Sequence, residues 1–157
     1  MDLSPAHEAA RQEAARVPAL YASLDLLEQA DPQATTVATI ELYGTTRPPA
    51  GDPPGGAPIV VMELTAGAGV VDETAIELQL TTPISGQITG ADPTTGTIPV
   101  WARIAQPDGS WWSDASVTVE GAGGEIQMPQ TGTENGNPVA RLFNGAMAQL
   151  SSAVFRG

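Results

Sequence analysis

The chain has 157 residues, which is enough for one domain with a hydrophobic core and too few to expect two. Hydrophobic residues make up 41% of it, charged residues only 15%, and the formal net charge is −12. Because this charge repels phosphate backbones and anionic lipid, we expect neither nucleic acid nor a membrane surface as a partner.

The chain contains no cysteine and no lysine. Disulfides, thiolate metal sites, thiolate nucleophiles and Schiff-base chemistry are therefore not expected. The six basic residues are all arginines, and two explanations stay open: a compositional bias of the genome, or forked contacts between each guanidinium and carboxylates. No apolar run approaches the ~18 residues of a membrane span, and the first thirty residues hold no signal-like core, so we expect a soluble protein.

Residues 4–29 are predicted to form a helix. Ser4 suits the N-cap and Pro5 the first turn, whereas Pro18 should break or kink the helix. Beyond Pro18 an apolar stripe appears at helical spacing, formed by Leu20, Leu24 and Leu27. Residues 6–16 are mostly Ala, Glu and Arg, so this half of the helix either packs weakly on its own domain or docks on another subunit.

The periodicity changes from helical to alternating after residue 37, where Ala38, Ile40 and Leu42 alternate with polar or aromatic neighbours. We therefore predict a helical arm over residues 1–31 and a β-sandwich domain over residues 32–157. Residues 47–58, rich in Pro and Gly, should form an exposed loop, either a connector or a segment laid across a neighbouring molecule.

Further strands are expected at short, regular spacing, as in a mainly β protein with an antiparallel sandwich or jelly-roll-like domain. The turn signature Gln106-Pro-Asp-Gly109 between two apolar runs predicts a hairpin. The expected strands after the Pro-Gly loop are residues 59–64, 75–80, 84–88, 97–104, 110–119, 125–128, 139–143 and 150–155.

The sequence offers few residues for catalysis. His7 is the only histidine, lies in the first turn of the predicted helix, and is expected to be solvated. Gly67-Ala-Gly69 lacks the third glycine and the lysine of a phosphate-binding loop, so we interpret it as a turn. Asp72, Glu73 and Glu77 form an acidic cluster without EF-hand spacing, so calcium binding stays possible but unsupported. We predict no catalytic, cofactor-binding or metal-binding residue.

Three tryptophans flank the predicted hairpin turn: Trp101, Trp111 and Trp112. Adjacent residues of a strand point to opposite faces, so Trp111 and Trp112 cannot share one core. One of them should be exposed or covered by a partner. Three interpretations stay open: a subunit contact, a platform on which a sugar stacks, or a core tryptophan beside one that covers an edge.

Three stretches carry a resemblance: residues 38–44 with the nearby Arg47-Pro48, residues 96–104 with Asp108-Gly109, and residues 140–145 with 150–155. They resemble a group of small proteins encoded among the structural genes of tailed bacteriophages, over roughly two-thirds of the chain. In that group the first strand ends in Tyr-Thr-Gly near Arg-Pro, and the second ends in Arg-Ile. The N-terminal helix and the Pro-Gly loop are larger here, which leaves the location in the virion open.

The resemblance implies a non-catalytic virion protein, made in the host cytoplasm, that decorates or cements the capsid; a neck or tail component is the next alternative. Expected partners are copies of the same chain, as a trimer, and other virion proteins such as the major capsid protein. The rival hypotheses are a carbohydrate-binding or adhesin domain and an enzyme subunit whose chemistry resides elsewhere. Candidate interface residues are Leu20, Leu24, Leu27, Arg47, Trp101, Trp111 and Trp112.

Overall fold

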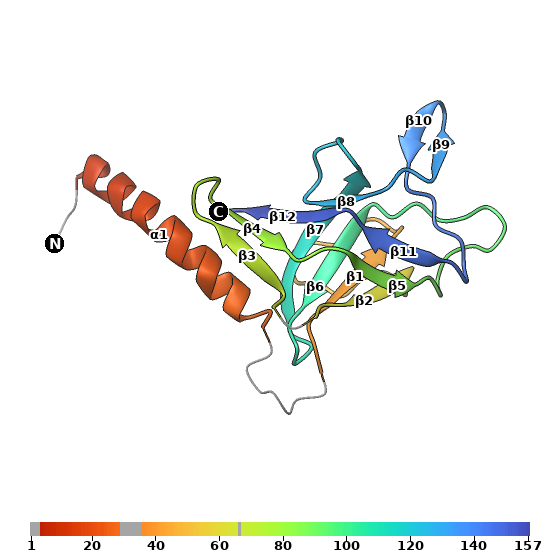
Figure 1. The fold of residues 1–157 in the computed structure, drawn as a ribbon, viewed down its shortest axis with the longest axis horizontal. Helices are drawn as coiled ribbons and strands as arrows, with labels where there is room; N and C mark the ends of the chain where they lie inside the picture. The colour runs from red at the N-terminus through yellow and green to blue at the C-terminus, as the bar shows by residue number, and fades with distance from the viewer. Residues whose placement is uncertain (1–3, 29–35, 66) are drawn as a thin grey trace.

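The computed structural model describes residues 4–28, 36–65 and 67–157. No helix among these residues is long and apolar enough to span a membrane. One helix precedes a series of short strands (Figure 1). The elements are α1 Pro5–Asp25, β1 Thr39–Tyr43, β2 Val60–Glu63, β3 Gly69–Asp72, β4 Glu77–Leu80, β5 Ile84–Gln87, β6 Trp101–Ala105, β7 Trp111–Val119, β8 Ile126–Met128, β9 Gly132–Glu134, β10 Asn137–Val139, β11 Met147–Leu150 and β12 Ser152–Arg156.

The main sheet is curled and has eight strands in the order β2-β1-β6-β7-β8-β12-β4-β3. Strands β5 and β11 pair with each other beside it, and a bridge between Val60 and Ile88 links the residue after β5 to β2. Apolar side chains from both sets of strands meet in one hydrophobic core. The protein is therefore mainly β with an N-terminal helix, as predicted, and consistent with a sandwich.

One pair in the main sheet is parallel rather than antiparallel. Strand β7 pairs with β8 in parallel register, from Val117 opposite Ile126 to Val119 opposite Met128. Parallel neighbours usually need a crossover of a dozen residues, but here residues 120–125 suffice. Gly121 and Gly123 adopt φ of 79° and 84°, in the left-handed region that favours glycine, and so allow the chain to reverse twice within this short loop.

Strand β12 joins two parts of the sheet that are far apart in the sequence. It pairs with β8 through Ala153 and Ile126 and with β4 through Val154 and Gln79, antiparallel in both cases. The hairpin β3-β4 has no other strand neighbour in the sheet. The long sheet is therefore continuous only because β12 is inserted between β8 and β4.

Helix α1 consists of a docked half and a projecting half. The Ser4 side chain caps it by accepting a hydrogen bond from the His7 backbone N–H at 3.3 Å, as predicted. The helix continues through Pro18 to Asp25, so the predicted break does not occur. Pro18 has no N–H to donate to the carbonyl oxygen of Ala14, four residues earlier. Both residues are exposed, so water can bind that oxygen and the helix continues.

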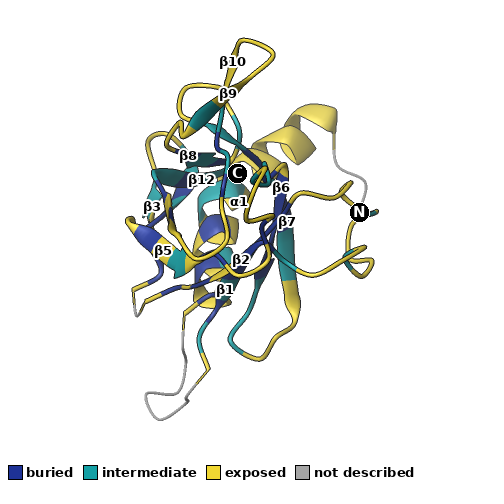
Figure 2. Cartoon of the chain, turned by 90° about the vertical axis from the view of Figure 1, so that its right-hand side faces the viewer, coloured by how far each residue is buried: buried dark blue, intermediate teal, exposed yellow. Residues whose placement is uncertain are grey.

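The docked half of α1 contacts β3 and β4 and contributes Leu20, Leu24 and Leu27 to the core of the β domain. Every residue from Ser4 to Ala15, by contrast, is exposed and extends away from the β body (Figures 1 and 2). The predicted boundary between residues 31 and 32 lies in a segment outside the described residues. Whether the β domain folds without the helix stays a prediction.

Candidate interaction surfaces

The β6-β7 hairpin carries a polar and aromatic cluster on the face covered by the Pro-Gly loop. The rings of Tyr43 and Trp101 stack with their centroids 4.4 Å apart, and Trp101 is 1% exposed. The Trp101 indole donates a hydrogen bond to the Thr45 carbonyl oxygen at 2.9 Å. This contact ties the start of the loop to the sheet.

A buried ion pair lies beside these rings. Arg103 donates two hydrogen bonds to the Asp114 carboxylate, from Nε at 2.8 Å and from Nη2 at 2.9 Å, because the two residues are direct cross-strand partners. Burial alone would raise the pKa of Asp114, but hydrogen bonds from Arg103 and Trp111 and the charges of Arg103 and Arg47 outweigh it, so that pKa lies below its ordinary value. Asp114 is therefore a carboxylate at neutral pH.

The same cluster holds the Pro-Gly loop in place. Arg47 donates a hydrogen bond from Nη2 to the Asp114 carbonyl oxygen at 2.7 Å, and Gly51 faces the Trp111 ring. The Tyr43 hydroxyl donates to the Glu41 carboxylate at 2.5 Å, and burial together with this bond raises the pKa of Tyr43. No buried side-chain polar atom among the described residues lacks a partner. The loop is thus fixed to its own sheet.

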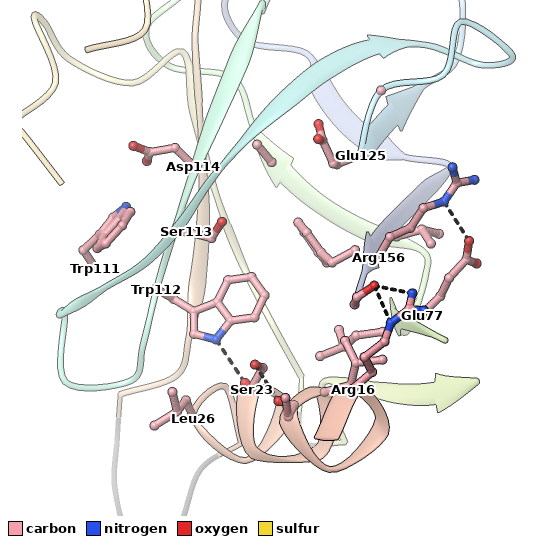
Figure 3. A pocket seen from close by; sticks show the side chains of 18 of the residues that line it. Arg16, Ser23, Leu26, Glu77, Trp111, Trp112, Ser113, Asp114, Glu125 and Arg156 are labelled. Carbon is pink, nitrogen blue, oxygen red and sulfur yellow. Dashed lines mark hydrogen bonds and ion pairs between the residues drawn. The ribbon is translucent and has the colours of Figure 1, made fainter. Parts of the chain in front are cut away.

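A β-bulge places the other two tryptophans on opposite sides of β7. Ile104 pairs with Ser113 and Ala105 with Trp111, which leaves Trp112 as the extra residue on the bulged strand. Trp111 is 44% exposed and lies on the side of β7 away from α1, whereas Trp112 points toward the helix (Figure 3). The predicted separation of the two side chains therefore holds, although the strand is not regular at this point.

Trp112 joins α1 to the β body. Its indole N–H donates to the Ser23 carbonyl oxygen at 3.0 Å, one of the last four helix carbonyls that have no partner within the helix (Figure 3). Its ring also packs edge-on against Phe155, with centroids 5.2 Å apart and an interplanar angle of 82°. A second tie comes from Arg16, which donates to the Gly157 carbonyl oxygen at 2.6 and 3.2 Å.

An open groove of about 1100 Å³ runs between α1, β7 and β12 (Figure 3). Its apolar lining includes Ala15, Ala19, Leu26, Trp112 and Phe155, with Trp111 at its edge. Two ion pairs lie at its surface: Arg16 with Glu13 at 3.1 Å, and Arg156 with Glu77 at 3.0 Å. The carboxylates of Asp114 and Glu125 also line it. The Arg156 side chain is 85% exposed, which leaves its guanidinium available to a second carboxylate.

The predicted acidic cluster separates into three local contacts. The Asp72 carboxylate accepts hydrogen bonds from the backbone N–H groups of Thr74 and Ala75, and Glu77 binds Arg156. Glu73 accepts from the Tyr21 hydroxyl at 2.9 Å. Within the described part of the chain, no three His, Asp or Glu side chains are placed to hold a metal ion.

Most of the predicted interface residues are buried by other parts of the same chain. Those buried in the chain's own core or polar cluster are Leu20, Leu24, Leu27 and Trp101. Trp112 is half-buried against α1, which leaves Trp111 and Arg47 exposed. Sequence reasoning did not single out the Arg103–Asp114 pair, although counting outward from Asp108 and Gly109 as the two turn residues places position 103 opposite position 114, as observed.

No protein-family model, curated protein or solved structure matches the chain. Its function is therefore inferred from its own contacts, charges and exposed surfaces, together with the sequence resemblance.

Proposed function

We propose that this protein is a non-catalytic structural subunit that acts in several copies, decorating or cementing the capsid of a tailed phage. One observation carries the structural role: the projecting half of α1 exposes every residue from Ser4 to Ala15 while its other half is anchored in the core. The assignment to a virion, with neck or tail as the alternative location, is supported by the sequence resemblance alone.

The projecting half of α1 is better suited to a partner than to solvent. An isolated helix of this length is marginal in water, and here only the docked half provides a stable start for it. Packing against another molecule would bury the alanines and stabilise the first turns of α1. An enzyme has no need of such an extension, whereas a subunit that cements a shell needs contacts with more than one neighbour.

The β body is suited to the same role. Large apolar side chains are exposed singly at several places on it, which favours several small contacts over one large one. They are Val61, Val70, Val100, Trp111, Phe143 and Met147. The buried Arg103–Asp114 pair and the fixed Pro-Gly loop keep this surface in one shape.

The test is incorporation into particles. We expect removal of residues 1–14 to reduce binding to shells at least tenfold while the midpoint of thermal unfolding changes by only a few degrees, because those that the structure describes, Ser4 to Ala14, are all exposed and make no core contact. Gly55→Ala, an exposed change with no neighbour within 4 Å, is the control and should bind like the wild type. Undiminished incorporation of the shortened chain would refute the role of the arm, and absence of the protein from purified particles would refute the virion assignment.

A carbohydrate-binding domain is the second candidate, and the exposed face of Trp111 favours it. In that case Trp111→Ala should abolish binding to a glycan array and leave incorporation into particles unchanged. The opposite result would favour the structural role: reduced incorporation of Trp111→Ala, and no glycan binding by the wild type or the variant.

A further inference from the structure

The groove beside α1 and the projecting half of α1 fit each other, and we propose that each groove receives the projecting helix of a second copy of this chain, in a two-fold antiparallel pair. This inference rests on the proposed role as a multi-copy structural protein and deepens it by naming the partner, with a dimer in place of the trimer expected from the sequence. Three properties of the described residues support it: the length of the arm, the spacing of one helix face and the size of the side chains on that face.

The lengths agree. Along α1 the groove is lined from Gln12 to Leu26, which at 1.5 Å per residue is about 21 Å. The projecting half from Pro5 to Ala15 is about 15 Å long by the same rise. The projecting helix therefore fits within the groove, where Trp112 and Phe155 could cover its outer side.

The face of α1 that lines the groove continues into the projecting half. Residues at helical spacing along this face are Glu8, Gln12, Ala15, Ala19, Ser23 and Leu26, of which the last five line the groove. Two antiparallel copies can place this face against itself, with Gln12 of one copy opposite Ala19 of the other. The two Ala15 residues then lie close to the two-fold axis.

The side chains on this face are small at the centre, which permits close approach of two helix backbones. Ala15 and Ala19 are both exposed in the single chain, so no side chain of the chain itself fills the space above them. In a reciprocal contact of this kind each copy gives one arm and receives one, so both arms are buried at once. No arm or groove is then left to bind a third copy.

The charges allow one further contact between the copies. The projecting half carries Glu8, Arg11 and Glu13, and the charged residues that line the groove are Arg16, Arg156, Glu77, Asp114 and Glu125, so neither surface is of one sign. Because Arg156 is 85% exposed, it can receive a carboxylate of the second copy without leaving Glu77.

The experiment measures the mass of the full-length protein in solution by light scattering. We expect a dimer for the wild type, a monomer for Ala15→Arg, and a dimer for Ala10→Arg. Ala10 is also exposed and lies about 180° from the centre of the groove-lining face, at 100° per residue, so it is a matched control. Arginine is a strong helix former, so neither change should unfold the arm.

A second measurement uses the absence of cysteine from the chain. Under mild oxidation Ala15→Cys should give a disulfide-linked dimer as the main product, and Ala10→Cys should not. A monomeric or trimeric wild type, an unchanged dimer for Ala15→Arg, or equal cross-linking of both cysteine variants would overturn the pairing. Incorporation into particles is scored separately, so failure of the pairing and failure of the virion role give different results.

Discussion

Replacing Trp112 tests how α1 is attached to the β body. In the structure this side chain makes two attachments: its indole N–H binds the Ser23 carbonyl oxygen of the helix, and its ring packs against Phe155 of β12. Trp112→Ala removes both. Trp112→Phe keeps an aromatic ring in place and removes only the hydrogen bond.

The expected losses in the free energy of unfolding follow from these contacts. Deleting a large aromatic from a core costs about 3 to 5 kcal/mol, and Trp112 is half-buried, so we expect the lower end, about 3 kcal/mol, for Trp112→Ala. The hydrogen bond accounts for about 1 kcal/mol of that, and the edge-on aromatic contact for about another 1 kcal/mol. Trp112→Phe should therefore cost about 1 kcal/mol. Trp111→Ala, which removes a side chain that is 44% exposed, should cost less than about 1 kcal/mol.

The free energy of unfolding is best measured by urea denaturation followed by circular dichroism, because the tryptophan fluorescence changes with each variant. The expected order of stability is wild type, Trp111→Ala, Trp112→Phe, Trp112→Ala. Equal destabilisation by Trp111→Ala and Trp112→Ala would show that both side chains share one environment. Unchanged stability of Trp112→Ala would show that the helix is held by other contacts.

Three other changes probe the buried pair and the close backbone contacts. Arg103→Ala should destabilise the protein by about 3 to 5 kcal/mol, because it leaves the Asp114 carboxylate buried without its partner. Folding lowers the pKa of Asp114, so its carboxylate stabilises the folded protein fully above the unfolded-state pKa of about 4, and this stabilisation is lost as pH falls through the lower folded-state pKa. Asp114→Asn should therefore make the free energy of unfolding less dependent on pH, measured by urea denaturation between about pH 2 and 6. Gly90→Ala should destabilise strongly, because a Cβ there would lie 2.2 Å from the Pro58 carbonyl oxygen, whereas the thermal midpoint of Gly55→Ala should match the wild type.

The local elements were predictable because their signals are local. The N-cap at Ser4 and the hairpin around Asp108-Gly109 both depend on neighbours within a few residues, and the structure has both. Strand bounds shifted where backbone chemistry intervened: the strand predicted over residues 97–104 begins at Trp101, two residues after Pro99, which has no N–H to donate to a ladder. Strand β3, from Gly69 to Asp72, was missed because its glycine was interpreted as part of a turn.

The arrangement of the elements was less predictable because it depends on contacts between distant residues. An apolar stripe at Leu20, Leu24 and Leu27 shows that one helix face is covered, but not whether the cover belongs to the same chain. The position of the Pro-Gly loop depends on hydrogen bonds to two backbone carbonyl groups, of Thr45 and Asp114, and a backbone acceptor has no sequence pattern. Nothing local predicts that β7 and β8 run parallel.

The insertion of β12 has an entropic consequence for the order in which the sheet can form. The β7-β8 pair joins Val117 to Ile126, nine positions later, whereas β12 joins Val154 to Gln79, 75 positions earlier. Loop-closure entropy grows with the logarithm of loop length, so closing the longer loop costs about 2 kcal/mol more than closing the shorter one. Until β12 is in place, no strand pairing joins the hairpin β3-β4 to the five strands β2, β1, β6, β7 and β8. Completion of the sheet therefore depends on five residues, Ser152–Arg156.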